Sequence, residues 1–167
     1  MKTLLISFNN YMGIIGILLF QTTCAVIPNI DNEMHQTQFQ ILTGLDVLID
    51  NDFSALKGKR VGLITNQTGL DQGLTQNMDI FVGSDNVELK AIFSPEHGLF
   101  GSASAGEKIT SDDGSTSGIP VHSLYGSTRK PTKAMLEGID ILLYDIQDTG
   151  IRSYTYISTM GLAMEAA

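Results

Sequence analysis

The amino-acid sequence predicts an α/β fold: a Rossmann-like, mainly parallel sheet with helices on both faces. Short uninterrupted apolar runs alternate along the chain with helical stretches, as expected for parallel strands that are buried on both faces. The composition agrees, since 43% of the 167 residues are hydrophobic, 17% are charged and 17 residues are glycines. These values fit a compact globular domain and exclude a disordered, collagen-like or coiled-coil chain.

The N-terminal segment is expected to precede this fold. A single lysine is followed by an apolar run over residues 11–20, which is typical of a secretory signal peptide and shorter than a membrane span. Residues 1–25 are therefore interpreted as a signal peptide cut after Ala25, and residues 26–40 as a leader. A lipid anchor at Cys24 is the alternative. In either case we expect an exported protein, periplasmic or secreted.

Residues 41–167 are predicted to form the domain, and its first element is a helix. Apolar residues recur there three and four positions apart, up to a helix end near Asn51. The members of this pattern are Ile41, Leu42, Leu45, Leu48 and Ile49.

Four apolar runs predict the strands of the sheet. The third run contains Pro120, which cannot donate to a strand ladder and is therefore expected at a sheet edge or at the start of a strand. The fourth is the clearest candidate for a buried strand. Helical crossovers between the runs would make the strands parallel. The four runs are Arg60–Thr65, Val87–Phe93, Ile119–Tyr125 and Ile139–Tyr144.

Three further helical stretches connect or follow these strands. They are predicted around Leu74–Gly83, over Thr132–Gly138 with Thr132 as the N-cap, and over Ile157–Ala167. Residues 99–118 are rich in Gly, Ser and Asp and have no period, so they are interpreted as a functional loop or insertion. One face of the last helix is predicted to carry Ile157, Met160, Gly161 and Met164.

The charge of the chain limits its partners. The formal net charge is −8, and the sequence has no basic stripe that would favour nucleic acid or an anionic membrane surface. An anionic substrate would need local arginines, and Arg129 and Arg152 are the candidates. No cofactor is predicted, because the sequence has no Gly-rich phosphate loop, two-histidine zinc helix or serine nucleophile elbow.

Polar residues follow three of the predicted strands, at residues 65–68, 94–97 and 145–148. The carboxyl ends of parallel strands share one edge of the sheet, and folds of this class bind ligands there. Taken singly, Asn66 or Asp148 is explained equally well as a cap of the helix that follows. Three coinciding clusters instead favour a ligand site.

Glu96 and His97 lie between Pro95 and Gly98, which favour a tight turn. Apolar neighbours would raise the pKa of the Glu96 carboxyl and suit it to act as a general acid. The alternative is a solvated Glu96 beside a His97 that hydrogen-bonds the backbone. A metal site built from Glu96, His97 and Asp145 is a minor alternative, because these residues have no recognised ligand spacing.

Five ordered motifs extend these observations. They are Leu56–Gly69, Phe93–Gly98, Ser123–Gly126, Arg129–Thr132 and Asp145–Gly161. Through them, the stretch from about Leu45 to Ala167 resembles the exo-β-N-acetylmuramidase (NamZ-type) family. The resemblance implies an exported glycosidase that removes N-acetylmuramic acid from the non-reducing end of peptidoglycan fragments. It also implies a Rossmann-like N-terminal domain packed on a C-terminal domain.

Members of that family are more than twice as long as this chain, so the resemblance implies an incomplete N-terminal catalytic domain whose C-terminal partner domain is missing. The expected substrate is a muramyl saccharide derived from peptidoglycan. A non-catalytic carbohydrate-binding fragment is the competing interpretation, and a metal-dependent hydrolase is a further one.

A mechanism follows from the resemblance and the residues together. Glu96 is the expected general acid on the leaving glycosidic oxygen, with His97 orienting it or binding a sugar hydroxyl. Asp145 or Asp148, facing Glu96 from a neighbouring strand end, is the expected second carboxylate. The acetamido group of the substrate and an elimination route are alternatives to that carboxylate.

An arginine is expected to bind the anionic group of the substrate. Arg129 or Arg152 would pair with the lactyl carboxylate that distinguishes muramic acid from glucosamine. For Arg152 the alternative is an ordinary ion pair with Asp145 or Asp148.

The remaining candidates are expected to contact the sugar. Tyr154 and Tyr156 alternate on an extended segment, so one is expected to line the site and the other to pack in the core. Asn66, Gln67 and Gln147 complete the predicted substrate-binding residues.

Overall fold

The computed structural model describes residues 41–107 and 118–167. These residues belong to one compact unit, Phe39–Ala167. The predicted signal peptide and leader, with Cys24, and the second half of the predicted loop lie outside the described residues.

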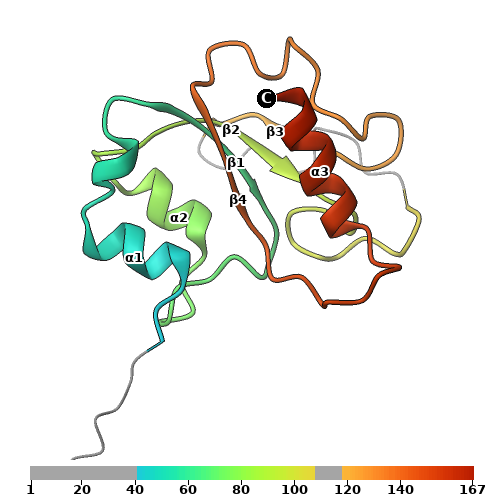
Figure 1. The fold of residues 1–167 in the computed structure, drawn as a ribbon, viewed down its shortest axis with the longest axis horizontal. Helices are drawn as coiled ribbons and strands as arrows, with labels where there is room; N and C mark the ends of the chain where they lie inside the picture. Colours follow the sequence, from blue (N-terminus) through green and yellow to red (C-terminus); the bar gives the residue numbers. More distant parts are fainter. Residues whose placement is uncertain (1–40, 108–117) are drawn as a thin grey trace, which may run out of the picture. The chain divides into compact units, whose positions relative to one another are not determined.

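Four parallel strands form a single sheet in the order β3-β2-β1-β4 (Figure 1). Their bounds are β1 Arg60–Thr65, β2 Glu88–Ser94, β3 Val121–Ser123 and β4 Ile141–Asp145. The chain moves outward from β1 to β2 and β3, and then returns to place β4 on the other side of β1. The predicted parallel sheet is confirmed. The reversal makes the β1–β4 pair the topological switch point, where folds of this class bind ligands.

Helices cover both faces of the sheet, as predicted. In Figure 1, α1 and α2 lie on one side of the sheet and α3 lies on the other. The helices are α1 Gly44–Asp50, the short 3-10 helix η1 Ser54–Leu56, α2 Asn77–Val82 and α3 Tyr156–Ala166.

Two apolar clusters, one on each face, hold the sheet between its helices. Successive side chains of a strand point to opposite faces, so alternate residues of β1 join different clusters. On the face of α1 and α2 the buried residues are Leu45, Phe53, Leu56, Val61, Leu63, Met78, Phe81, Ile92 and Leu99. On the face of α3 they are Ile64, Ala91, Phe93, Leu124 and Ala163.

Gly62 lets the side chains of the strands on either side of β1 approach one another. A Cβ atom at this position would lie 2.7 Å from Cδ2 of Leu142 in β4 and 3.1 Å from Cε2 of Phe93 in β2. Both distances are shorter than ordinary contacts between carbon atoms. The central strand therefore needs glycine here for packing, on the face that α3 covers.

The first helix is confirmed, but it begins at Gly44 rather than at Ile41. Thr43 forms a capping box with Asp46: its hydroxyl accepts from the Asp46 amide at 3.2 Å, and its own amide donates to the Asp46 carboxylate at 2.8 Å. This reciprocal pair satisfies two backbone donors at the helix start. The cap therefore fixes the first residue of α1, and the apolar residues before it lie outside the helix.

The second helix is shorter than predicted. It begins at Asn77, because Leu74 has a φ of 63° and lies outside the helix with an exposed side chain. A leucine in the left-handed region cannot continue a right-handed helix. The apolar pattern before Asn77 is therefore not a helical face.

The helix predicted over Thr132–Gly138 is absent, and the segment forms turns. The Thr132 hydroxyl accepts from the amide of Met135 at 3.3 Å, as an N-cap would. At Gly138 φ is 76°, so the chain leaves the helical region after a single turn. The predicted cap is present, but the helix does not propagate.

The two edges of the described sheet are formed by β3 and β4. β3 is an edge strand, as Pro120 predicts, and the Pro120 carbonyl accepts from the amide of Ile92 at 2.9 Å. β4, the run expected to be buried most completely, is the other edge, and all five of its residues are half-buried. Its apolar sequence therefore does not place it in the centre of this sheet.

The helical face predicted for α3 is wrong. Ile157 and Met164 are 53% and 71% exposed, whereas Tyr156, Thr159 and Ala163 are buried. The rotation of the helix is set at its first residue, because Tyr156 is bonded through its hydroxyl and its carbonyl to neighbours inside the domain.

Candidate active site

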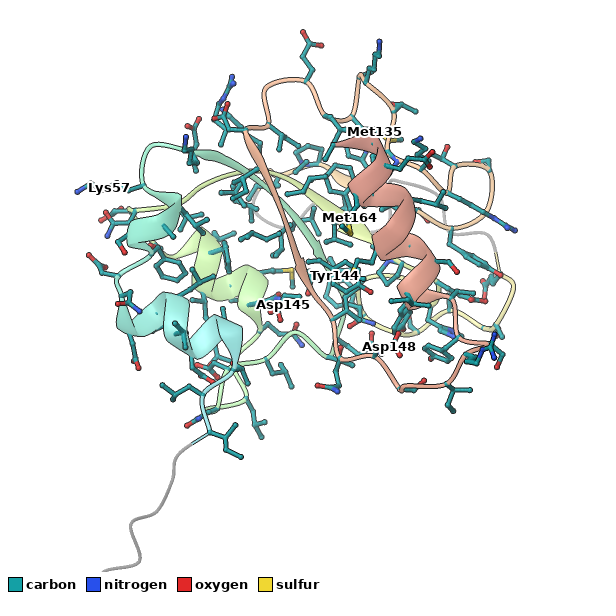
Figure 2. All side chains as sticks on the ribbon, in the orientation of Figure 1. Lys57, Met135, Tyr144, Asp145, Asp148 and Met164 are labelled. Atoms are coloured by element: carbon teal, nitrogen blue, oxygen red, sulfur yellow. The ribbon has the colours of Figure 1, made fainter. Side chains whose placement is uncertain are left out.

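The three polar clusters predicted after the strands lie at one edge of the sheet, because all four strands run in the same direction. Figure 2 shows Tyr144 and Asp145 at the end of β4 and Asp148 in the segment that follows. The loop after β2 carries Glu96 and His97.

The Glu96 carboxylate accepts hydrogen bonds from two different segments, and a tyrosine hydroxyl from a third acts on it. Oε2 accepts a hydrogen bond of 2.7 Å from the hydroxyl of Thr155, the residue that precedes α3. Oε1 accepts from the backbone amide of Gly106 at 3.1 Å. The hydroxyl of Tyr125, which follows β3, also acts on the carboxylate and lowers its pKa. Glu96 is half-buried, so this carboxylate is both fixed and partly shielded from water.

Opposing effects set the pKa of Glu96. Burial of the carboxyl raises the pKa, but hydrogen bonds from Thr155, Tyr125 and the Gly106 amide lower it, and so does the neighbouring His97. The result lies below the ordinary value for a glutamate. The expectation of a raised pKa is therefore wrong for this structure, because three donors to the ionised form outweigh desolvation.

Tyr125 and Thr155 are absent from the sequence-based prediction of the site. Ser123 fixes Tyr125 locally, since its hydroxyl accepts from the Tyr125 amide at 3.2 Å and donates to the Tyr125 carbonyl at 3.1 Å. The available signals were weak: a tyrosine at the end of an apolar run, and a threonine just before a predicted helix. Neither indicates which carboxylate the hydroxyl will meet.

His97 lies in a strained turn and bonds the backbone. Its φ is 71°, and the following Gly98 has a φ of 79°. Nδ1 lies 3.0 Å from the carbonyl oxygen of Ala103. A carbonyl only accepts, so Nδ1 carries the proton and Nε2 of the neutral ring is the acceptor. The ring lies against that of Tyr154, with 6.5 Å between centroids.

Asn66 connects the end of β1 to the start of α3. It is completely buried, and its side-chain amide donates to the hydroxyl oxygen of Tyr156 at 2.9 Å. Its oxygen accepts from the amide and the hydroxyl of Thr68, at 3.0 and 2.6 Å. Asn66 therefore supports the site from inside the domain, and its amide has no surface to offer a sugar.

The two tyrosines differ in burial, and one of them packs in the core as the alternation predicts. Tyr156 is 3% exposed and packs inside the domain. Tyr154 is half-buried, meets the ring of Tyr156 edge-on at 4.7 Å, and lies beside His97. Tyr154 is therefore the tyrosine on the side of the site.

Asp145 holds elements of the fold together. Its Oδ2 accepts from the side-chain amide of Asn77 in α2 at 2.6 Å, and its backbone carbonyl accepts from the hydroxyl of Thr65 at 3.0 Å. Strand β1 lies between β2 and β4, so Asp145 does not face Glu96 from a neighbouring strand end. That prediction is wrong because the sheet order inserts β1 between the two strands.

The metal site predicted from Glu96, His97 and Asp145 is not formed, because β1 separates Asp145 from the other two residues. Within residues 41–107 and 118–167, no group of three or more His, Cys, Asp and Glu side chains is arranged to hold a metal ion. The same part of the chain contains no helix of the length and apolarity needed to span a membrane.

Two buried acceptor atoms lie near the switch point. Oε1 of Gln67 and Oδ2 of Asp148 have no hydrogen-bond partner among the described residues. The other carboxylate oxygen of Asp148 accepts from the Gly150 amide at 2.7 Å. A hydrogen bond of 2.9 Å from the Gln147 amide to the Thr68 hydroxyl joins the two loops that carry these atoms. Buried acceptors normally find donors, so these atoms suit the hydroxyl or amide groups of a ligand.

The amide groups of the two predicted glutamines are placed differently. The Gln67 side chain lies over Gly101, where an added Cβ would be 2.5 Å from Cδ of Gln67. It therefore extends from the loop after β1 to the loop that follows His97. Gln147 is exposed, and its side-chain amide donates to the carbonyl of Asp148 at 3.3 Å.

The arginines separate in the structure. The Arg129 guanidinium carbon lies 5.9 Å from the centre of the Tyr125 ring. Both residues, with Thr155, Leu124 and the first turns of α3, line a hollow of about 190 Å³. Tyr125 therefore contacts Arg129 with its ring and interacts with Glu96 through its hydroxyl.

Arg152 is exposed. Among the described residues it forms no ion pair, so the alternative pairing with Asp145 or Asp148 is not present. Of the two predicted arginines, Arg129 is the one whose contacts among the described residues lead to Glu96, through the ring of Tyr125.

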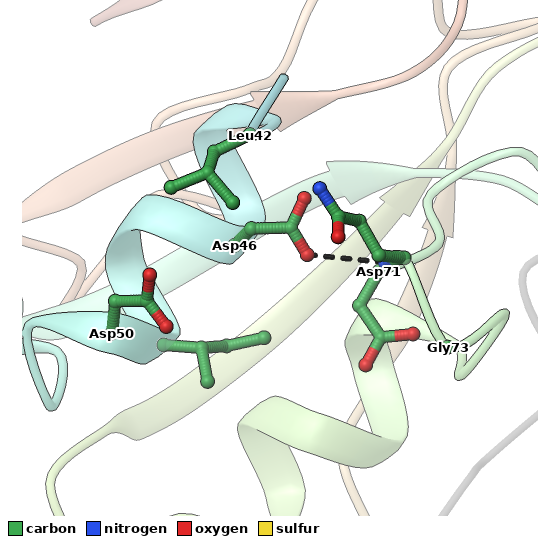
Figure 3. A pocket seen from close by; sticks show the side chains of 7 residues that line it. Leu42, Asp46, Asp50, Asp71 and Gly73 are labelled. Carbon is green, nitrogen blue, oxygen red and sulfur yellow. Dashed lines mark hydrogen bonds between the residues drawn. The ribbon is translucent and has the colours of Figure 1, made fainter. Parts of the chain in front are cut away.

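A larger hollow, of about 320 Å³, lies between α1 and residues 71–73 (Figure 3). It contains none of the predicted site residues. Asp46 accepts from the backbone amide of Gln72 at 3.1 Å, the bond drawn as a dashed line, and its pKa is lowered by bonds from Thr43 and then from Gln72. Asp46 therefore stabilises α1 and the adjacent loop.

The fold and the candidate site together define a class: an α/β domain whose polar residues gather at the carboxyl edge of a parallel sheet, where folds of this class bind ligands. The chain belongs to the family described as "Exo-beta-N-acetylmuramidase NamZ, N-terminal", whose sequence profile matches residues 61–167. The resemblance predicted from the five motifs is confirmed.

Relatives agree with this assignment. The chain is 44% identical over 153 residues to "Peptidoglycan beta-N-acetylmuramidase NamZ" of Bacillus subtilis (strain 168), covering 91% of this chain and 37% of that protein. Crystal structures of two DUF1343 family proteins from Bacteroides fragilis NCTC 9343 are also similar. BF0371 has 54% identity and a TM-score of 0.68, and BF0379 has 35% identity and a TM-score of 0.59.

The chain spans about a third of the length of these relatives. The matches to the two solved structures cover 75% and 76% of this chain, and 31% of each of those proteins.

Proposed function

We propose that this chain forms the N-terminal, catalytic part of a glycosidase that releases N-acetylmuramic acid from the non-reducing end of peptidoglycan fragments. Support comes from the family membership and from the 44% identity to a protein named as a peptidoglycan β-N-acetylmuramidase. The observation that carries the proposal is the Glu96 carboxylate, fixed at the carboxyl edge of the sheet beside a hollow lined by Arg129.

Glu96 is proposed as the general acid. Its proton goes to the glycosidic oxygen as the bond from that oxygen to C1 of the muramic acid breaks, and a water molecule then supplies the hydroxyl group at C1. The Thr155, Tyr125 and Gly106 donors hold the carboxyl in one position. A fixed acid is effective because little reorganisation is needed at the moment of proton transfer.

Asp148, rather than Asp145, is proposed as the second carboxylate. Asp145 is bonded to Asn77, whereas Oδ2 of Asp148 is buried without a partner among the described residues. Neighbouring strands lie about 4.8 Å apart, so the ends of β2 and β4 are about 10 Å apart. Glu96 and Asp148 lie in the loops after these strand ends, and a similarly wide spacing of their carboxylates would correspond to an inverting rather than a retaining glycosidase. A reaction assisted by the acetamido group is the alternative.

Arg129 is proposed to bind the lactyl carboxylate of the substrate. Its guanidinium lines the hollow, which also has the apolar side chains of Leu124 and Leu162. A lactyl group carries a carboxylate and a methyl group, and these match a guanidinium beside an apolar wall. Arg152 has no such surroundings.

The sugar ring is proposed to lie between the loops that follow β1, β2 and β4. His97 offers Nε2 as an acceptor, and Tyr154 lies beside it. Gln67 offers a buried oxygen from the loop after β1, and Gln147 is exposed on the loop after β4. Asn66 acts indirectly, by fixing the loop on which Gln67 lies.

A C-terminal domain of the kind implied by the longer relatives is proposed to pack on this one and to complete the site. An apolar hollow of about 140 Å³ between β4 and α3, lined by Tyr144, Met160 and Met164 among others, offers a packing surface. Met164 is 71% exposed in the described unit. Export of the protein, through residues 1–25, is part of the same proposal, because peptidoglycan lies outside the cytoplasmic membrane.

A carbohydrate-binding module without turnover is the second candidate function. The observation that favours it is the lowered pKa of Glu96, because an ionised carboxylate accepts hydrogen bonds from sugar hydroxyls and has no proton to give.

One experiment separates the two functions. The chain is incubated with a chromogenic β-N-acetylmuramide, and release of the chromophore is measured alongside binding of the unreacted sugar by calorimetry. Release at a rate above the uncatalysed reaction supports the glycosidase. Binding without release, by a folded chain, supports the binding module for this chain and rejects the catalytic proposal for it.

A further inference from the structure

Thr155 occupies an unusual position for a helix-capping residue. It stands at the N-cap of α3, yet its side chain makes no bond to the backbone of that helix. An N-cap threonine normally accepts a hydrogen bond from an amide of the first turn. Here the hydroxyl donates instead to Oε2 of Glu96, 59 residues earlier in the chain, at 2.7 Å.

The remainder of the α3 terminus is arranged so that Thr155 keeps this orientation. The carbonyl of Thr155 accepts from the amide of Thr159 at 3.0 Å and from its hydroxyl at 3.2 Å. The start of a helix also favours a nearby negative charge, through the partial positive charge of its free amides. The backbone of Thr155 is therefore fixed, and its side chain adopts the rotamer that directs the hydroxyl towards Glu96.

Tyr125 approaches the same carboxylate from the other side. Its backbone is fixed by Ser123, its hydroxyl interacts with Glu96, which raises the pKa of the Tyr125 hydroxyl, and its ring lies under Arg129. Tyr125 and Thr155 come from different elements and both line the hollow of about 190 Å³. Glu96 is therefore held between the end of β3 and the start of α3.

We propose that Thr155 and Tyr125 are positioning residues for Glu96: their hydroxyl groups, at the start of α3 and just after β3, hold the carboxylate in one orientation at the carboxyl edge of the sheet. This inference rests on the proposed function only where it concerns catalysis. The Thr155 hydroxyl donates to the carboxylate, and the Tyr125 hydroxyl lowers its pKa. A donor to an ionised carboxylate stabilises that form more than the protonated one.

The other groups that face Glu96 either also lower the pKa of its carboxyl or are unchanged by the substitutions. The Gly106 amide donates to Oε1, and His97 on the same loop lowers the pKa of the carboxyl when charged. Arg129 reaches the carboxylate only through Tyr125. None of these groups is removed by a change at Thr155, so the effect of that hydroxyl is measurable by itself.

Carboxyl titration measures the proposal without any substrate. The chain is labelled with ¹³C at the side-chain carboxyl of glutamate, and the Glu96 signal, assigned by its absence in Glu96→Gln, is followed against pH. In Thr155→Val and in Tyr125→Phe we expect Glu96 to titrate at higher pH. The ratio of protonated to ionised Glu96 at fixed pH should rise about fivefold for each donor removed. Thr155→Ser, which keeps the hydroxyl, should restore the original titration.

Ser153→Ala is the matched control, because it removes an exposed hydroxyl from the same segment and should leave the titration unchanged. Amide spectra of each variant verify folding. An unchanged titration in both Thr155→Val and Tyr125→Phe, in folded protein, overturns the proposal. An equal shift in Ser153→Ala overturns it as well, since the effect would then not depend on the bonded hydroxyls.

The pH profile of glycoside release separates this inference from the proposed function. A general acid loses activity as the pH rises through its pKa, so the alkaline limb should move to higher pH in Thr155→Val and Tyr125→Phe. If the titration moves and the limb does not follow, the positioning role stands and Glu96 is not the acid. If Thr155 and Tyr125 had only a structural role, the substitutions would lower activity without shifting either the titration curve of Glu96 or the pH profile of release.

Discussion

The side-chain amide of Asn66 donates a buried hydrogen bond of 2.9 Å to the hydroxyl oxygen of Tyr156, joining the end of β1 to the first residue of α3. The bond lies behind the candidate site, since α3 begins directly after Thr155, the donor to Glu96. Through it, the loop after the central strand and the helix that holds Glu96 are fixed relative to one another.

Replacement of Asn66 by alanine should therefore destabilise the domain. The change removes the acceptor of the Thr68 amide and hydroxyl and the donor to the Tyr156 hydroxyl. Buried polar groups that lose a partner cost about 1–3 kcal/mol each. We expect the free energy of unfolding in urea to fall by about 2–3 kcal/mol. Asn51→Ala is the control: its side-chain bond to the Val47 carbonyl is exposed, and it should cost about 0.5 kcal/mol. Equal losses in the two variants would contradict the structural role of Asn66.

Two glycines should respond oppositely to alanine. At Gly62 the added methyl would lie 2.7 Å from Cδ2 of Leu142, whereas at Gly161, within α3, nothing lies within 4 Å. Gly62→Ala should cost about 1–3 kcal/mol through overpacking. Gly161→Ala should stabilise the domain by about 0.5–1 kcal/mol, because alanine is the better helix former. Thermal unfolding of both variants checks the pair, and a stabilising Gly62→Ala would refute the close packing over β1.

Alkaline pH should destabilise the domain through two tyrosines. Burial raises the pKa of Tyr144 and of Tyr156 to about 12, from 10. Because the folded-state pKa is the higher one, the contribution to stability is complete below pH 10 and is lost as the pH rises towards 12. Absorbance titration should show these two phenols ionising late or on unfolding. Ionisation of all the phenols near pH 10 in folded protein would contradict the burial of both hydroxyls.

The two arginines offer a test of substrate selection. In Arg129→Met we expect KM for a muramide to rise about 10- to 150-fold, the equivalent of about 1.5–3 kcal/mol for a lost charged hydrogen bond. Hydrolysis of the corresponding glucosaminide, which lacks the lactyl carboxylate, should change little. Arg152→Met should leave both substrates nearly unaffected. A larger effect of Arg152→Met on the muramide would reassign the carboxylate contact.

The sequence predicts the strands of this fold better than it predicts the partners of Glu96. The run Arg60–Thr65 coincides with β1, because a strand buried on both faces needs only a local apolar sequence. The prediction of the buried face of α3 is wrong, because the rotation of the helix depends on a hydrogen bond from Asn66, which is far away in the chain. Thr155 and Tyr125 meet Glu96 through contacts of the same kind, and no local pattern encodes them.

The sequence likewise indicates the environment of the Glu96 carboxyl only in part. Phe93 and Leu99 are buried on either side of Glu96, as their apolar character indicates. The hydrogen bonds that lower its pKa come from elements that the fold brings there, so the direction of the shift is a property of the structure.

The most direct test of the central claim is the rate of N-acetylmuramic acid release by the chain and by its Glu96→Gln variant, with binding of the muramide measured in both. Glutamine keeps the size of the side chain and removes the proton that the mechanism transfers. We expect release to fall by a factor of about 10²–10⁴, the usual contribution of a general acid, while binding is retained. Release by Glu96→Gln at the rate of the unaltered chain would contradict the assignment of Glu96 as the acid.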